Sequence, residues 1–268
     1  MRGRRLILAC LVCSRLSGCV TQSGADLQGQ TILVAGASGR TGRYVVQRLQ
    51  DDHLRFRAMT RNRAEAVKRL SAADPAVDWN RVDWIECDVR DPAQAAAAMR
   101  GVDRVISVIG ANTVGDDNSA EFVDYGGVRN LVDAAVREKV QQFVLLTAIG
   151  VTDPAHPFNK ATKGALSWRF KGEEYLRASG LTYTIVRPGG LVNDPAGQKG
   201  LRLEQGDVWR PLLRSTLSRD DLALVLIEAL RQPGPATSPS SWSMTRVSPR
   251  APGGTASPRS SPTPIKKS

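Results

Sequence analysis

The chain has 268 residues, enough for one large α/β domain or at most two small ones. Its formal net charge is +11, but residues 1–19 and 233–268 together carry nine basic side chains and no acidic one, which leaves +2 for residues 20–232. A nearly neutral body argues against a nucleic-acid partner. Two histidines, and one cysteine beyond residue 19, argue against a zinc site, a disulfide framework or a Ser-His-Asp triad, and no metal site is predicted.

The first nineteen residues contain the parts of a bacterial secretory signal in order. A basic end precedes the apolar run Leu6–Cys13, which is too short to span a bilayer, and Leu16–Cys19 resembles a lipobox, whose cysteine becomes lipidated. Arg4–Leu8 also resembles a twin-arginine signal, which exports folded proteins with their cofactors. We predict a signal peptide over 1–19, a polar tether over 20–29 and a lipid anchor at Cys19 that makes the membrane a partner. The alternative is an N-terminal extension on a cytoplasmic protein.

A glycine turn between a strand and a helix is the most informative stretch of the chain. Thr31–Ala35 suits a strand buried on both faces, and Gly36, Gly39 and Gly42 follow at G-x-x-G-x-x-G spacing before a helical pattern. The missing side chains let a dinucleotide diphosphate reach backbone N–H groups at a helix N-terminus. Gly36 is expected to serve the turn, Gly39 the close approach, and Gly42 the packing of helix on strand. The alternative interpretation is an ordinary glycine-rich turn.

The end of the second strand predicts which dinucleotide binds. Leu54–Thr60 alternates apolar and basic residues and ends at Arg61, where an acid would bind a free ribose hydroxyl and an arginine would bind a 2′-phosphate. Arg40 lies inside the glycine turn, and we expect Arg40 and Arg61 to converge on one site. The predicted cofactor is therefore NADP (NADPH), unless both arginines are solvated surface charges. Asn62 begins the next helix as a capping residue.

Three further strands complete a parallel-sheet pattern. Residues 82–87 lead to Asp88, which is expected either near the adenine or as the cap of the helix over 92–99. Residues 102–109 form the fourth strand, ending at Gly110, and a polar loop over 112–117 lies where such sheets bind ligands. A helix over 120–138 and a strand over 143–146 follow. Alternating strands and helices with apolar strands predict an α/β, doubly wound parallel sheet.

At this point the chain resembles the atypical short-chain dehydrogenase/reductase superfamily, in its NmrA-like, NAD(P)H-binding branch. The matching motifs are residues 36–42 (GASGRTG), 88–91 (DVRD), 124–130 (DYGGVRN) and 179–190 (SGLTYTIVRPGG). The resemblance covers about residues 30–232 and implies a Rossmann fold with NADP in the crevice and a small C-terminal substrate lobe. With the glycine turn and strand ends, it gives the predicted cofactor-binding residues: Gly36, Ser38, Gly39, Arg40, Thr41, Gly42, Arg61, Asp88, Val89, Gly110 and Lys171.

The catalytic residues of better-known family members are mostly missing. Those members use a serine after the fifth strand and a Tyr-x-x-x-Lys on the next helix, but here Ala148 takes the serine position, with Thr147 as a substitute. Lys171 is the candidate ribose ligand, and the pocket is expected between residues 112–117 and 189–195. We predict an NADPH-dependent reductase of a small organic substrate such as a flavin, quinone or tetrapyrrole. The alternative is a non-catalytic NADP-binding redox sensor or assembly factor.

The C-terminal part contains one clear helix. Ser218 begins a capping box for the apolar helix Leu222–Leu230, and Arg202–Glu204 suits a short strand. Beyond Gln232 the composition changes to Pro, Ser, Gly and Arg, and only Trp242–Met244 suggests a strand. We therefore expect disorder over residues 233–268.

Overall fold

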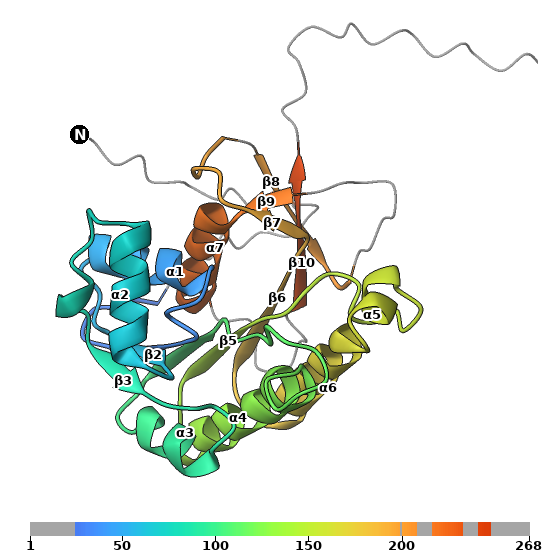
Figure 1. Cartoon of the computed structure of the whole chain (residues 1–268), viewed down its shortest axis with the longest axis horizontal. Helices are drawn as coiled ribbons and strands as arrows, with labels where there is room; N and C mark the ends of the chain where they lie inside the picture. The colour runs from blue at the N-terminus through green and yellow to red at the C-terminus, as the bar shows by residue number, and fades with distance from the viewer. Residues whose placement is uncertain (1–24, 199, 208–215, 233–240, 248–268) are drawn as a thin grey trace, which may run out of the picture.

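The computed structural model describes residues 25–198, 200–207, 216–232 and 241–247 (Figure 1). The predicted signal peptide, with the lipobox and Cys19, lies outside these residues. The prediction of a tether over 20–29 is wrong for residues 25–29, the part that the structure describes. There Leu27 is buried in the core, and the Ala25 N–H donates to the Arg231 carbonyl oxygen. The buried Leu27 side chain and the Ala25 N–H both attach this part of the segment to the domain.

The elements, in chain order, are β1 Ile32–Ala35, α1 Gly42–Asp51, β2 Phe56–Thr60, α2 Arg63–Ala73, η1 Trp79–Arg81, β3 Trp84–Glu86, α3 Pro92–Met99, β4 Arg104–Ser107, η2 Glu121–Gly127, α4 Val128–Arg137, β5 Gln142–Leu146, α5 Pro157–Ala161, α6 Ala165–Ala178, β6 Tyr183–Pro188, β7 Gly190–Val192, β8 Gly200–Gln205, β9 Thr216–Ser218, α7 Arg219–Arg231 and β10 Ser241–Val247. The main sheet has the strand order β3-β2-β1-β4-β5-β6-β10-β8. Every pairing in it is parallel except that of β8 with β10. The predicted doubly wound α/β Rossmann fold is confirmed.

Helices cover both faces of this sheet, and the strands are apolar on both faces for that reason. In β1, Ile32 and Val34 belong to the core cluster that α1 and α7 complete, whereas Leu33 and Ala35 belong to the one completed by α3 and α4. Figure 1 shows α1, α2 and α7 on one side of the sheet, and α3, α4 and α6 on the other. None of the described helices combines the length and the hydropathy needed to cross a bilayer.

The helix predicted over residues 120–138 is divided in two. Its first part, η2, is a π-helix, and α4 continues from Val128 with regular α-helical geometry. Gly127 lies at the junction, where an added Cβ would stand 2.7 Å from Val89 Cγ2. A single-turn π-helix inside a helical run is often found beside a functional site.

The expectation of disorder over residues 233–268 is wrong for residues 241–247, which form β10. This strand pairs in parallel with β6 and antiparallel with β8, so it forms main-chain hydrogen bonds on both edges. These hydrogen bonds offset the conformational entropy that the segment loses on ordering, which the composition does not take into account. The strand suggested by Trp242–Met244 is therefore present. The remainder of the predicted tail lies outside the described residues.

A smaller unit follows β6, as the predicted C-terminal lobe requires. β7 and β9 form a separate two-stranded parallel sheet. The predicted cap of α7 is present, because the Ser218 hydroxyl accepts from the N–H groups of Asp220 and Asp221.

Candidate functional site

The glycine turn is closed so tightly that two of its glycines leave no room for a side chain. Gly36 has φ +84°, and a Cβ there would lie 3.0 Å from the Val108 carbonyl oxygen. At Gly42 a Cβ would lie 2.2 Å from the Gly36 carbonyl oxygen, so this glycine serves the closure of the turn itself and not only the packing of helix on strand. Thr41, the N-cap of α1, makes no side-chain hydrogen bond to the first turn. The helix N-terminus can therefore receive an anion.

A cleft of about 420 Å³ lies over the carboxyl ends of the first four strands. Seven predicted cofactor residues line it, namely Gly36, Ser38, Gly39, Arg61, Asp88, Val89 and Gly110. Arg40, Thr41, Gly42 and Lys171 are not among its lining residues. The volume is within the range of small-molecule and cofactor sites.

Two arginines lie at the β2 end of this cleft. Arg61 donates to the Asn118 side chain at 2.7 Å, and Arg69, on α2, donates to the Ser38 carbonyl oxygen at 2.6 Å. The Ser38 and Thr60 hydroxyls are hydrogen-bonded at 2.9 Å between them. Sequence reasoning missed Arg69, although it follows Glu65 by one helical turn and both residues line the cleft.

Arg40 does not join Arg61 in this cleft, so the two arginines do not converge as expected. Arg40 is exposed, and its charge acts on Arg219, whose pKa is lowered first by burial and then by Arg40 and Arg43. The Arg219 guanidinium donates to the Leu191 carbonyl oxygen and to Asn193 Oδ1 at 2.8 Å. The basic group around Arg40 therefore faces the segment after β6.

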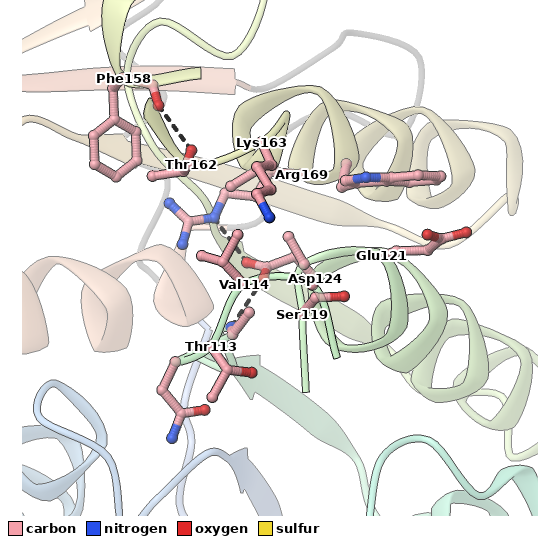
Figure 2. A pocket seen from close by; sticks show the side chains of 15 residues that line it. Thr113, Val114, Ser119, Glu121, Asp124, Phe158, Thr162, Lys163 and Arg169 are labelled. Carbon is pink, nitrogen blue, oxygen red and sulfur yellow. Dashed lines mark hydrogen bonds and ion pairs between the residues drawn. The ribbon is translucent and has the colours of Figure 1, made fainter. Parts of the chain in front are cut away.

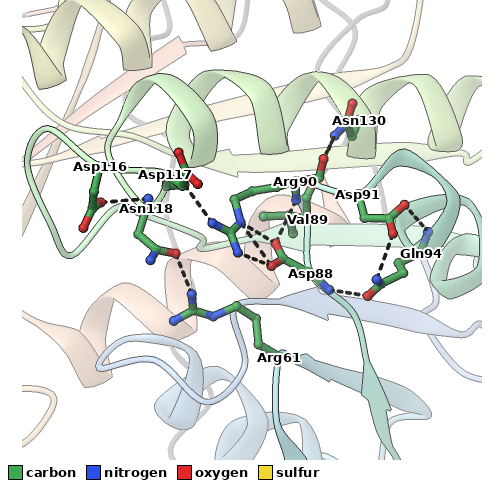
Figure 3. A network of polar contacts seen from close by, with 10 residues as sticks. All are labelled: Arg61, Asp88, Val89, Arg90, Asp91, Gln94, Asp116, Asp117, Asn118 and Asn130. Carbon is green, nitrogen blue, oxygen red and sulfur yellow. Dashed lines mark hydrogen bonds and ion pairs between the residues drawn. The ribbon is translucent and has the colours of Figure 1, made fainter.

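Asp88 is held by Arg90 and does not cap a helix. Its carboxylate accepts from the Arg90 guanidinium at 2.6 Å, and this hydrogen bond holds the pKa of Asp88 below its ordinary value. Asp91 caps α3 instead, by accepting from the Ala93 and Gln94 N–H groups. Arg90 also donates to the Asp117 carbonyl oxygen, so that Arg61 and Arg90 both contact the loop over residues 112–118 (Figure 3).

A second cavity, of about 270 Å³, adjoins the first. Its lining includes residues 111–115, Phe158, Lys163, Trp168 and Arg169, and Asn112 lines both cavities. The loop predicted to bind ligands over residues 112–117 is therefore placed at the site. The segment 189–195, expected as the other wall, lines neither cavity.

Asp124 of η2 organises this second cavity (Figure 2). It is buried, and it accepts from Arg169 Nε at 2.7 Å and from the Ala111 N–H at 2.9 Å. One carboxylate thus ties α6 to the loop that follows β4. Sequence reasoning missed this ion pair, although Asp124 belongs to the DYGGVRN motif.

The two predicted catalytic residues lie outside both cavities. Lys171 is exposed, with its Nζ 3.7 Å from the centre of the Trp168 ring. Thr147 donates to Glu173 at 2.6 Å, and Glu173 is fully buried in an ion pair with Arg187. The structure therefore does not bring Lys171 or Thr147 to the cleft, and the α6 cation that lines a cavity is Arg169.

The side chains that line the second cavity offer no conventional proton relay. No tyrosine, histidine or cysteine is among its described lining residues. In the larger cleft Cys87 is the sole thiol among the described residues, and burial raises its pKa to about 12, so that it remains protonated and inert. No group of His, Cys, Asp and Glu side chains within the described ranges could hold a metal ion.

Comparison with known proteins identifies relatives of this chain. The chain is 30% identical over 236 residues to sanguinarine reductase from Eschscholzia californica, covering 75% of this chain and 84% of that protein. It is 30% identical over 225 residues to NAD(P)H azoreductase from Xenophilus azovorans, covering 81% and 71%. A solved short-chain dehydrogenase/reductase from Veillonella parvula in complex with NADP has the same fold, with a TM-score of 0.62 and 17% identity over 81% of this chain and 94% of that one.

Two further findings concern location and family. Relatives from Arabidopsis thaliana include proteins described as chloroplastic. A family model described as NAD(P)H-binding matches residues 36–233, which include the glycine turn and both cavities. The chain therefore belongs to the NAD(P)H-binding family, the NmrA-like branch of the atypical short-chain dehydrogenase/reductases, as its sequence motifs predicted.

Proposed function

We propose that this protein is an NADPH-dependent reductase of a small conjugated organic substrate such as a flavin, a quinone or a tetrapyrrole. One observation carries the proposal: the cleft over the glycine turn adjoins a second cavity, and Asn112 lines both. The similarity to sanguinarine reductase and to NAD(P)H azoreductase supports the same reaction class.

The choice of NADPH rests on the β2 end of the cleft. In the proposed complex Arg61 and Arg69 bind the 2′-phosphate, while the diphosphate lies against the part of the glycine turn that lines the cleft. The carboxylate of Glu65 also lines this part of the cleft. Because two guanidinium groups and one carboxylate leave a net positive charge here, this end of the cleft favours a ribose with a 2′-phosphate over one with a free hydroxyl.

The remaining residues position the substrate. NADPH supplies a hydride when it is bound. Asp124 fixes the Ala111 N–H and Arg169, so the wall between the two cavities keeps one geometry. Because the described lining contains no tyrosine or histidine, the substrate takes its proton from solvent, as a reduced quinone or flavin can.

Turnover of the reduced cofactor tests this function. We expect the purified protein to consume NADPH absorbance with members of a panel of flavins, quinones and tetrapyrroles, and to do so more slowly with NADH. Tight NADPH binding without consumption by any panel member would instead favour the second candidate, a non-catalytic redox sensor or assembly factor. The missing Tyr-x-x-x-Lys relay is the feature that favours that candidate.

We also propose that residues 1–19 export the chain and that a lipid on Cys19 attaches it to a membrane. The order of basic, apolar and lipobox residues supports this location. Cys19→Ser is expected to release the protein from the membrane fraction, and replacing Arg4 and Arg5 with Lys is expected to retain it in the cytoplasm. Unchanged fractionation of both variants would support the cytoplasmic alternative.

A further inference from the structure

The second cavity contains two cationic side chains with unused hydrogen-bond donors. Arg169 uses Nε for Asp124, and its two terminal nitrogens make no hydrogen bond to any residue that the structure describes. Lys163 also lines the cavity, and it forms no ion pair within the described part of the chain. An arginine fork and a lysine ammonium together suit a carboxylate or a sulfonate.

The acidic residues of the cavity leave these donors unused, although Asp124 forms an ion pair with Arg169. Both carboxylate oxygens of Asp124 are engaged, one by Arg169 Nε and the other by the Ala111 N–H. Glu121 also lines the cavity, but Figure 2 shows its carboxylate well apart from the Arg169 guanidinium. The positive groups therefore face the open space with their donors free.

The remaining walls of the cavity are suited to a flat ring. Phe158 and Val114 line it and are 49% and 52% exposed, so their apolar surfaces are open to a ligand. Trp168 also lines the cavity, with its ring stacked on Tyr125 and the Lys171 ammonium over it. Such walls bind an apolar ring, while polar groups at one side fix its orientation.

We propose that the substrate is a planar conjugated ring system that bears an acidic group, held by the terminal nitrogens of Arg169 and by Lys163 Nζ. This inference rests on the proposed reductase function and specifies its substrate class. The acid gives orientation and selectivity, and the ring carries the group that is reduced.

A matched pair of probes tests the proposal: anthraquinone-2-carboxylate and its methyl ester, which share one ring system. In turnover, one quinone oxygen accepts the hydride as the nicotinamide C–H bond breaks, and the other takes a proton from water. The quinone becomes a hydroquinone and NADPH becomes NADP⁺. Binding is measured by titration with the NADP⁺-loaded protein, in which no reduction occurs, and turnover is measured with NADPH without oxygen.

We expect the acid to bind about tenfold more tightly than the ester, because charge-assisted hydrogen bonds are formed only with the acid. Lys163→Gln should weaken binding of the acid about fivefold and leave the ester unchanged, and Arg169→Lys, which keeps the charge but loses the fork, should act in the same direction. Lys160→Gln is the matched control, since Lys160 is exposed near this cavity without lining it, and it should change neither affinity.

Equal affinity for acid and ester, or an equal loss for both probes in Lys163→Gln, would overturn the proposal. Equal affinities with NADPH consumption by both probes would leave the reductase function standing and remove the acid site. Selective binding of the acid without NADPH consumption would support the acid-binding site and count against the reductase function with these rings.

Discussion

Arg61 and Arg69 reach the β2 end of the cleft from two different elements. Arg61 follows β2 directly, whereas Arg69 extends from the second turn of α2 to the Ser38 carbonyl oxygen. A guanidinium placed in this way gains a charge-assisted hydrogen bond from a 2′-phosphate and gains nothing comparable from a hydroxyl. The preference between the two nicotinamide dinucleotides is therefore expected to depend on these two side chains.

Replacing both arginines tests that dependence. Arg61→Gln with Arg69→Gln is expected to reduce the affinity for NADPH about tenfold or more, and to leave the affinity for NADH nearly unchanged. Arg40→Ala is the comparison, because Arg40 does not line the cleft and should not alter the ratio of the two affinities. The measurement is a fluorescence titration of each cofactor. If Arg40→Ala changed the ratio of NADPH to NADH affinity and the double arginine variant did not, the assignment of Arg61 and Arg69 to the 2′-phosphate would be contradicted.

At the scale of elements, two glycines let η2 lie close to α6 and to the segment between β3 and α3. A Cβ on Gly127 would lie 2.7 Å from Val89 Cγ2, and one on Gly172 would lie 2.7 Å from the Asp124 carbonyl oxygen. This close approach sets Asp124 within reach of both Arg169 and the Ala111 N–H. The π-helical geometry of η2 thus contributes to the wall of the second cavity.

Gly127→Ala is expected to destabilise the fold by about 1–3 kcal/mol, because the added methyl overpacks against Val89. Gly126→Ala is the matched control in the same helix: its Cβ would lie 3.4 Å from the Glu121 carbonyl oxygen, an ordinary contact, and alanine favours a helix. Urea unfolding measures both. The double variant Val89→Ala/Gly127→Ala should lose less than the sum of its two single changes, and strict additivity would count against this contact.

Local chemistry could be predicted from the sequence, and contacts between distant segments could not. The glycine turn, the Asn62 cap and the Ser218 cap depend on residues within one turn of each other, and all three are present. Arg69 and the Asp124–Arg169 pair depend on how α2 and α6 pack, which no local pattern reports. Lys171 shows the same limit: it follows Arg169 by two residues, and its ammonium lies over the Trp168 ring while Lys171 itself does not line the cavity.

At the scale of the whole molecule, β10 connects the Rossmann sheet to its antiparallel edge. It lies between β6 and β8, so β8 is paired to the rest of the sheet only through it among the described strands. The short sheet of β7 and β9 arises from the same stretch of chain between β6 and α7. The order of the C-terminal lobe is therefore expected to depend on a strand whose flanking composition suggested disorder.

Truncation tests this dependence directly. A chain that ends after Gln232 lacks β10, which leaves the β6 edge and the whole of β8 without main-chain partners, and we expect it to unfold at a clearly lower urea concentration. A chain that ends after Val247 keeps every described pairing and should match the full chain. Hydrogen exchange should show the loss of protection over β8 and β6, while β1 keeps its protection because its partners β2 and β4 are untouched. Equal unfolding midpoints and equal protection of β8 in the two truncated chains would show that β10 does not support the lobe.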